Sequence, residues 1–112
     1  MDTSVWDRNE LLDRVGGDEE FLTEVVRTFL EDAPTRFDEL RKAFSRGDEV
    51  AARLHSHALK GAAASIGAGA FRDMAKAIED ATAGGQLERA KDLMARLHEE
   101  FQRLKPLLVV QG

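Results

Sequence analysis

The chain has 112 residues, of which 43% are hydrophobic, and this length and composition favour a single domain, residues 1–112, with one modest core. It has no cysteine, which excludes disulfides and thiolate metal sites, and no apolar run near the roughly 20 residues that a membrane span requires, so we expect a soluble cytoplasmic protein. The formal net charge of −5 argues against a nucleic-acid partner, because binding to phosphates needs a basic face.

The apolar residues predict helices throughout the chain, because no stretch alternates steadily with a period of two residues. The first helix is short, covers about residues 5–14 and stops at Gly16-Gly17. Asp18 then caps a longer helix, whose apolar side chains form a broad buried face. The candidates for inward-facing side chains in the first helix are Trp6 and Leu11 or Leu12.

Proline at position 34 predicts an interruption of the second helix. Proline fits the first turn of a helix but disfavours helical backbone in the residue before it, so we expect a kink or break at Pro34 and a separate helix over about residues 34–46. Gly47 and Asp48 then indicate a helix end followed by a new cap. The next helix is therefore expected over about residues 49–66.

Two further helices complete the pattern. Gly67 and Gly69 separate the helix over residues 49–66 from one that ends at Gly84-Gly85, and Pro106 is expected to end the last helix. That last helix repeats apolar residues in steps of three and four, which is typical of a helix in an antiparallel bundle. Because the connections are short, we expect an all-α fold, an antiparallel up-and-down four-helix bundle with an additional short N-terminal helix.

The stretch RLHSHALKGAAASIGA, residues 53–68, is unusual because it places two histidines, a lysine and a glycine in an alanine-rich helix. At about 100° per residue, the two histidines point apart, His57 toward solvent and His55 toward the edge of the apolar face. The side chains on the solvent side are Val50, Arg53, His57, Lys60, Gly61 and Ala64. The apolar side is expected to hold Ala51, Leu54, His55, Ala58, Leu59, Ala62, Ser65 and Ile66.

His57 is the candidate for chemistry. A neutral imidazole keeps one lone pair and acts as a nucleophile, for which a phosphoryl group is the natural electrophile, and Lys60 supplies one positive charge for its oxygens. Gly61 costs about 1 kcal/mol relative to alanine in mid-helix, so its missing side chain points to a surface that another protein's active site approaches closely. The chain has no phosphate-binding glycine-rich loop and no evident acidic metal cluster around His57, so a partner is expected to bring the metal and the acidic site. From these residues alone, the interpretation of His57 and Lys60 as ordinary exposed surface also stays open.

The run His57-Ala58-Leu59-Lys60-Gly61, continued by AAASIGA to Ala68, resembles the H-x-L-K-G-x-x-x-x-[small or apolar]-G-A signature of histidine-containing phosphotransfer (HPt) domains. The segments DEEFLTEVVRTFLEDAP and FRDMAKAIEDA are also typical of that family, so the likeness covers nearly the whole chain. It implies a helical bundle in which His57 accepts a phosphoryl group from the aspartyl phosphate of a response-regulator receiver domain and passes it, reversibly, to another receiver. Lys60 would contact the phosphoryl group.

The resemblance also implies a face on which the receiver docks, formed by Arg53, Gly61 and Ala64, with Gly61 leaving room for the receiver. The reactive atom would be the imidazole nitrogen farther from the backbone, and Mg²⁺ would be held by the receiver, so we expect no cofactor and no metal on this chain. Receiver domains are the implied partners, with a sensor histidine kinase in cis as a further candidate. We expect a monomer without kinase activity of its own.

Three other functions stay open at this point. The phosphoacceptor domain of a chemotaxis-type kinase has the same histidine motif but is charged by an ATP-binding domain. A helical interaction module would bind a partner without chemistry. A metal- or heme-binding bundle is disfavoured, because a metal pair on one helix normally uses positions i and i+4, whereas His55 and His57 are two residues apart and diverge.

Overall fold

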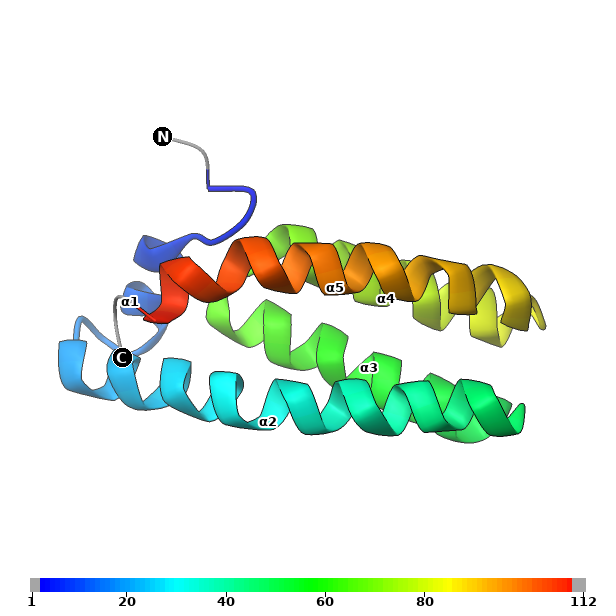
Figure 1. The fold of residues 1–112 in the computed structure, drawn as a ribbon. Helices are drawn as coiled ribbons and strands as arrows, with labels where there is room; N and C mark the ends of the chain where they lie inside the picture. The colour runs from blue at the N-terminus through cyan, green and yellow to red at the C-terminus, as the bar shows by residue number, and fades with distance from the viewer. Residues whose placement is uncertain (1–2, 110–112) are drawn as a thin grey trace.

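The computed structural model describes residues 3–109, and within them the chain forms five helices. They are α1 (Arg8–Arg14), α2 (Glu19–Arg46), α3 (Glu49–Ile66), α4 (Gly69–Ala83) and α5 (Leu87–Val109). Helices α2 to α5 run alternately in opposite directions along the long axis, and α1 lies at the end where α2 begins and α3 ends (Figure 1). The predicted all-α bundle with a short additional N-terminal helix is therefore confirmed. Residues 1–2 and 110–112 of the predicted domain lie outside the described residues.

The helix boundaries follow the caps that the sequence predicts. Asp18 and Asp48 precede α2 and α3, and each side chain accepts a hydrogen bond of 3.0 Å from a backbone N–H of the first turn. Gly47 and Gly67 follow the same helices with positive φ angles of 66° and 80°, a conformation that glycine adopts at little cost. Only residues 47–48 connect α2 to α3, and only residues 67–68 connect α3 to α4, and such short connections make these helices antiparallel neighbours.

The prolines do not end helices, so the predicted interruptions at Pro34 and Pro106 were wrong. Helix α2 is continuous from Glu19 to Arg46 with Pro34 inside it, and α5 continues through Pro106 to Val109. Both proline rings are exposed. On either side of them, Ala33 and Phe37 of α2 and Leu104 and Leu108 of α5 are buried in the core. The packing of these flanking residues outweighs the local cost of a helical proline, which is about 3 kcal/mol.

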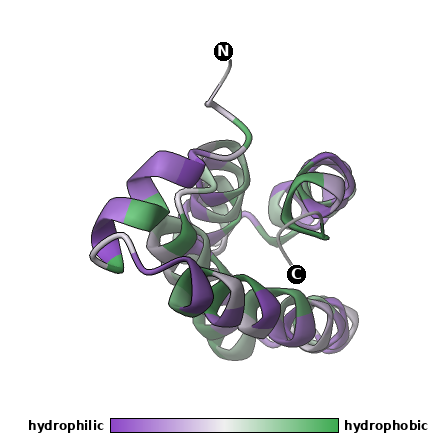
Figure 2. Ribbon diagram, turned by 90° about the vertical axis from the view of Figure 1, so that its left-hand side faces the viewer, coloured by the Kyte–Doolittle hydropathy of each residue, from purple (hydrophilic) through white to green (hydrophobic). Residues whose placement is uncertain are grey.

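Four phenylalanines form the centre of the core. Phe29 and Phe37 of α2 contact Phe71 of α4 and Phe101 of α5, and the contacting ring centroids lie 5.5 to 6.4 Å apart. Each helix combines hydrophobic with hydrophilic residues, as Figure 2 shows in a view onto the end where α1 lies. None of the helices in residues 3–109 has an apolar stretch of the kind that a membrane-spanning segment needs.

Helix α3 lies between α2 and α4, and this position decides which of its faces is buried. The predicted apolar face was only partly right, because Leu59 and Ile66 are buried but Leu54 and Ser65 are exposed. The hydropathy pattern predicts that Leu54 is buried. Helix α3 packs against both α2 and α4, however, and such close packing favours small side chains in the interface. The buried side chains of α3 are Ala52, Ser56, Leu59, Ala63 and Ile66. The hydroxyl of Ser56 is satisfied inside the helix, since it donates to the backbone oxygen of Ala52 at 2.8 Å.

The segment before α1 holds the end of α3 in place. The Trp6 indole N–H donates to the backbone oxygen of Ile66 at 2.8 Å, and the backbone N–H of Asp7 donates to the oxygen of Gly67 at 2.9 Å. Trp6 is buried, as predicted, although it precedes α1, which begins only at Arg8. The approach is close, because a Cβ at Gly67 would lie 2.8 Å from the backbone oxygen of Asp7.

This contact predicts different costs for two glycine substitutions. Gly47→Ala places a side chain in the same left-handed conformation but in open space, so it should lower the free energy of unfolding by about 1–2 kcal/mol. Gly67→Ala meets the Asp7 backbone as well and should cost roughly 1–3 kcal/mol more. Urea denaturation of both variants measures the difference, and equal losses would contradict the close contact at Gly67.

Candidate functional site

His57 lies on the outer side of α3, next to α4. Its side chain is 65% exposed, and its Nδ1 lies 2.5 Å from Oε2 of Glu79 on α4. A carboxylate accepts hydrogen bonds and donates none, so the proton of the neutral imidazole is on Nδ1. The lone pair of Nε2, the nitrogen farther from the backbone, is therefore left free. This is the arrangement that a nucleophilic imidazole requires.

Glu79 binds Lys60 as well as His57. Its Oε1 accepts a hydrogen bond of 2.7 Å from the ammonium of Lys60, and its side chain is only 13% exposed. Burial by itself would raise the pKa of Glu79, but the hydrogen bonds and charges of Lys60 and His57 outweigh burial and hold that pKa below its usual value. At neutral pH the ionised carboxylate of Glu79 thus lies between the side chains of His57 and Lys60.

The sequence does not single out Glu79 as a residue of the site. The only sequence signal is its place beside Ile78, a fully buried residue, which puts Glu79 at the boundary of the buried face of α4. Its partners are 19 and 22 residues away along the chain, so only the packing of α4 against α3 brings them together.

The structure brings Arg53 and Lys60 close to His57 but separates Ala64 from them. Arg53 and Lys60 line the same shallow opening as His57, whereas Ala64 lies one turn beyond Gly61, half-buried, where its backbone oxygen accepts a hydrogen bond from Arg14 of α1. The residues that line the opening are Val50, Arg53, Leu54, His57, Lys60, Glu79, Asp80 and Ala83. Gly61 and Ala64 of the predicted face therefore lie along α3 beyond this opening.

Gly61 is exposed, and among the residues that the structure describes its lack of a side chain makes room for no neighbour. A Cβ built at Gly61 meets no atom within 4 Å. Next to the imidazole, the apolar side chains of Val50 and Leu54 are 81% and 60% exposed. Large apolar side chains at such exposure, two turns and one turn before His57, are typical of a surface that another protein covers.

The second histidine, His55, belongs to the opposite side of α3. It is half-buried, and its Nδ1 lies 2.9 Å from a guanidinium nitrogen of Arg36 on α2. The predicted divergence of the two histidines is therefore confirmed, since one contacts α2 and the other α4. Within residues 3–109, no group of three or more His, Cys, Asp or Glu side chains is arranged to hold a metal ion.

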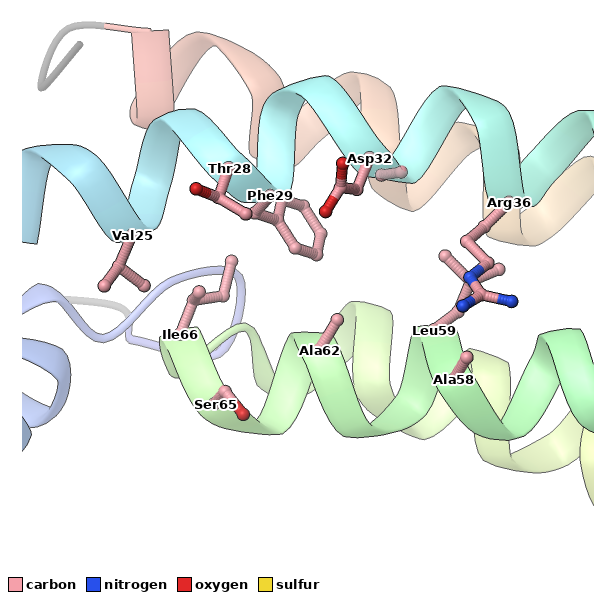
Figure 3. A pocket seen from close by; sticks show the side chains of 11 residues that line it. Val25, Thr28, Phe29, Asp32, Arg36, Ala58, Leu59, Ala62, Ser65 and Ile66 are labelled. Atoms are coloured by element: carbon pink, nitrogen blue, oxygen red, sulfur yellow. The ribbon is translucent and has the colours of Figure 1, made fainter.

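A groove between α2 and α3 lies on the same side as His55. Its lining is mostly apolar, and Figure 3 shows Phe29 and Ile66 on its floor with Arg36 reaching from α2 toward α3. His57 does not line this groove, although its neighbour Ala58 does. Eleven residues line the groove, namely Val25, Thr28, Phe29, Asp32, Ala33, Arg36, Ala58, Leu59, Ala62, Ser65 and Ile66.

Three comparisons relate this chain to known proteins. The sequence model of the Hpt domain family matches residues 24–106. The phosphorelay intermediate protein rdeA of Dictyostelium discoideum is 29% identical over 106 residues, which are 95% of this chain and 42% of that protein. The chain thus spans less than half the length of this curated relative. The crystal structure of histidine-containing phosphotransfer protein B (HptB) from Pseudomonas aeruginosa PAO1 superposes with a TM-score of 0.90 at 25% identity, covering 98% of this chain and 96% of that one.

The hydrogen bonds of Glu79 predict a pH dependence of stability. Because its pKa is lower in the folded chain than the ordinary 4.5, ionised Glu79 stabilises the fold above that pH, and this contribution is lost as the pH falls through the folded pKa. Lys60→Met should raise the pKa of Glu79, because it removes a hydrogen bond and a charge. Carbon-13 NMR titration of the Glu79 carboxyl measures both values, and a wild-type pKa at or above the ordinary one would contradict the described contacts.

Proposed function

This chain belongs to the Hpt domain family, and from that premise we propose that it works as a phosphorelay intermediate in which His57 carries the phosphoryl group. The observation that carries the proposal is the hydrogen bond between Nδ1 of His57 and Glu79, on a ring that is 65% exposed. It leaves the Nε2 lone pair free at the surface, where a second protein can reach it.

The proposed reaction is the transfer of a phosphoryl group from an aspartyl phosphate to Nε2. The lone pair of Nε2 attacks phosphorus, the bond between phosphorus and the aspartyl oxygen breaks, and the aspartate leaves with that electron pair as a carboxylate. The ring keeps its proton on Nδ1 and becomes positively charged. Glu79 lies against this proton, so its negative charge stabilises the phosphorylated ring. The reverse sequence of bond changes passes the group to another receiver.

Lys60 has a second role in this proposal. Its ammonium group binds Glu79 in the free chain, but its flexible side chain brings the charge to the oxygens of a phosphoryl group on His57, one turn away. Transfer of a phosphoryl group depends on such charge neutralisation more than on covalent chemistry by the protein. Lys60 would thus contact Glu79 in the free chain and the phosphoryl group in the charged chain.

The proposed partner is a response-regulator receiver domain, which would hold the Mg²⁺ and the reactive aspartate. It would dock over the exposed surface around His57, where Gly61 gives it room and Val50 and Leu54 offer apolar contact. Arg53 borders this surface, and Ala64 extends it by one turn along α3. A sensor histidine kinase in cis, a cytoplasmic location and a monomeric state are consistent with this role and belong to the same proposal.

Replacement of the proposed phosphoacceptor tests the function directly. Incubation with a phosphorylated receiver should place an acid-labile, alkali-stable label on the wild-type chain and on His55→Gln, and none on His57→Gln, because glutamine has no nucleophilic ring nitrogen. Autoradiography after transfer measures the label. Labelling of His57→Gln at the wild-type level would contradict the proposal, and labelling only by a kinase domain with ATP would instead identify the chemotaxis-type alternative.

Substitution of Gly61 separates folding from docking. Gly61→Ala should raise the free energy of unfolding by about 1 kcal/mol, because the Cβ meets no neighbour and alanine is the better helix former. Gly61→Leu should also fold, but it should slow transfer from the receiver by about tenfold or more, which is a barrier increase of about 1.4 kcal/mol. Its reaction with a small phosphoryl donor should be unchanged. Transfer kinetics equal to wild type would show that the receiver docks elsewhere.

A further inference from the structure

The two histidines of α3 have partners of opposite charge. Nδ1 of His57 lies 2.5 Å from the carboxylate of Glu79, whereas Nδ1 of His55 lies 2.9 Å from the guanidinium of Arg36. The rings are two residues apart on one helix, and each forms its hydrogen bond through the same ring nitrogen. The two rings can therefore be compared directly, because they differ in the charge of the side chain that binds Nδ1.

The partner determines where the proton of each neutral ring lies. A guanidinium group donates hydrogen bonds and accepts none, so Nδ1 of His55 must supply its lone pair to Arg36 and the proton must be on Nε2. His57 has the reverse arrangement, with the proton on Nδ1 and the lone pair on Nε2. Only one of the two rings thus presents a free lone pair, and that ring is His57.

The charges of Glu79 and Arg36, like the positions of the ring protons, favour reaction at His57 over reaction at His55. When a neutral imidazole attacks phosphorus, the ring gains a positive charge, which the nearby carboxylate of Glu79 stabilises at His57. At His55 the same charge would develop next to the guanidinium of Arg36, which repels it. Attack by His55 would also require that its proton move to Nδ1 and that the hydrogen bond to Arg36 break.

We propose that Arg36 is a positioning residue that keeps His55 from accepting a phosphoryl group and so directs phosphorylation to His57. The inference rests on the proposed function of His57 and adds the selection between the two rings. Arg36 crosses from α2 toward the turn of α3 that carries Ala58, as Figure 3 shows, and it takes no part in the opening around His57. Without Arg36, His55 would be a half-buried imidazole free to present either nitrogen.

The test uses phosphoramidate, a small phosphoryl donor that reacts without a receiver domain. The full chain is compared as wild type, Arg36→Met, which removes the donor and the charge, and Arg36→Lys, which keeps both. Arg41→Met on the same helix is the matched control, because Arg41 pairs with Asp38 and not with a histidine. Peptide mapping gives the rate of phosphorylation at each ring, and nitrogen-15 NMR gives the tautomer of His55.

We expect the wild-type chain and Arg41→Met to have the proton of His55 on Nε2 and to react at His57. Arg36→Met should raise the rate at His55 by about fivefold or more and leave the rate at His57 unchanged, and Arg36→Lys should restore the low rate at His55. A proton on Nδ1 of His55 in the wild type, or an unchanged rate at His55 in Arg36→Met, would overturn the inference. Failure of transfer from a receiver would instead contradict the proposed function, because the small donor bypasses docking.

Discussion

One carboxylate, that of Glu79, joins the two helices that form the site. It is almost fully covered between α3 and α4, and it accepts hydrogen bonds from both His57 and Lys60. The first bond orients the ring and sets its proton on Nδ1, and the second keeps an ammonium group within reach of the ring. In the proposed function, the reactivity of His57 thus depends on the packing of α3 against α4, although His57 itself is exposed.

The outer face of α3 carries a mid-helix glycine and two exposed apolar side chains, and neither feature stabilises the free chain. Gly61 weakens the helix, and the exposed Val50 and Leu54 gain nothing from burial in the free chain. The fold compensates at the other face, where α3 packs between two helices, and at its end, where the Trp6 indole and the Asp7 backbone N–H bind the carbonyl groups of Ile66 and Gly67. A well-anchored helix can therefore present a surface shaped for a partner.

The fold was predictable where local chemistry decides it. Asp18, Asp48, Gly47 and Gly67 end or begin helices through hydrogen bonds within a few residues, and helical periodicity alone places His57 outside. Tertiary packing overrode local rules at Pro34, where buried neighbours keep α2 continuous. The partners of the two histidines were beyond sequence reasoning, because Glu79 and Arg36 reach them from other helices.

The central claim concerns one atom, Nε2 of His57. In a chain uniformly labelled with nitrogen-15 and charged by a phosphorylated receiver, the one-bond coupling between phosphorus-31 and nitrogen-15 identifies the nitrogen that carries the phosphoryl group. The account predicts coupling to Nε2 of His57, with the proton of the same ring still on Nδ1 toward Glu79. Coupling to Nδ1 of His57, or to either nitrogen of His55, would contradict it.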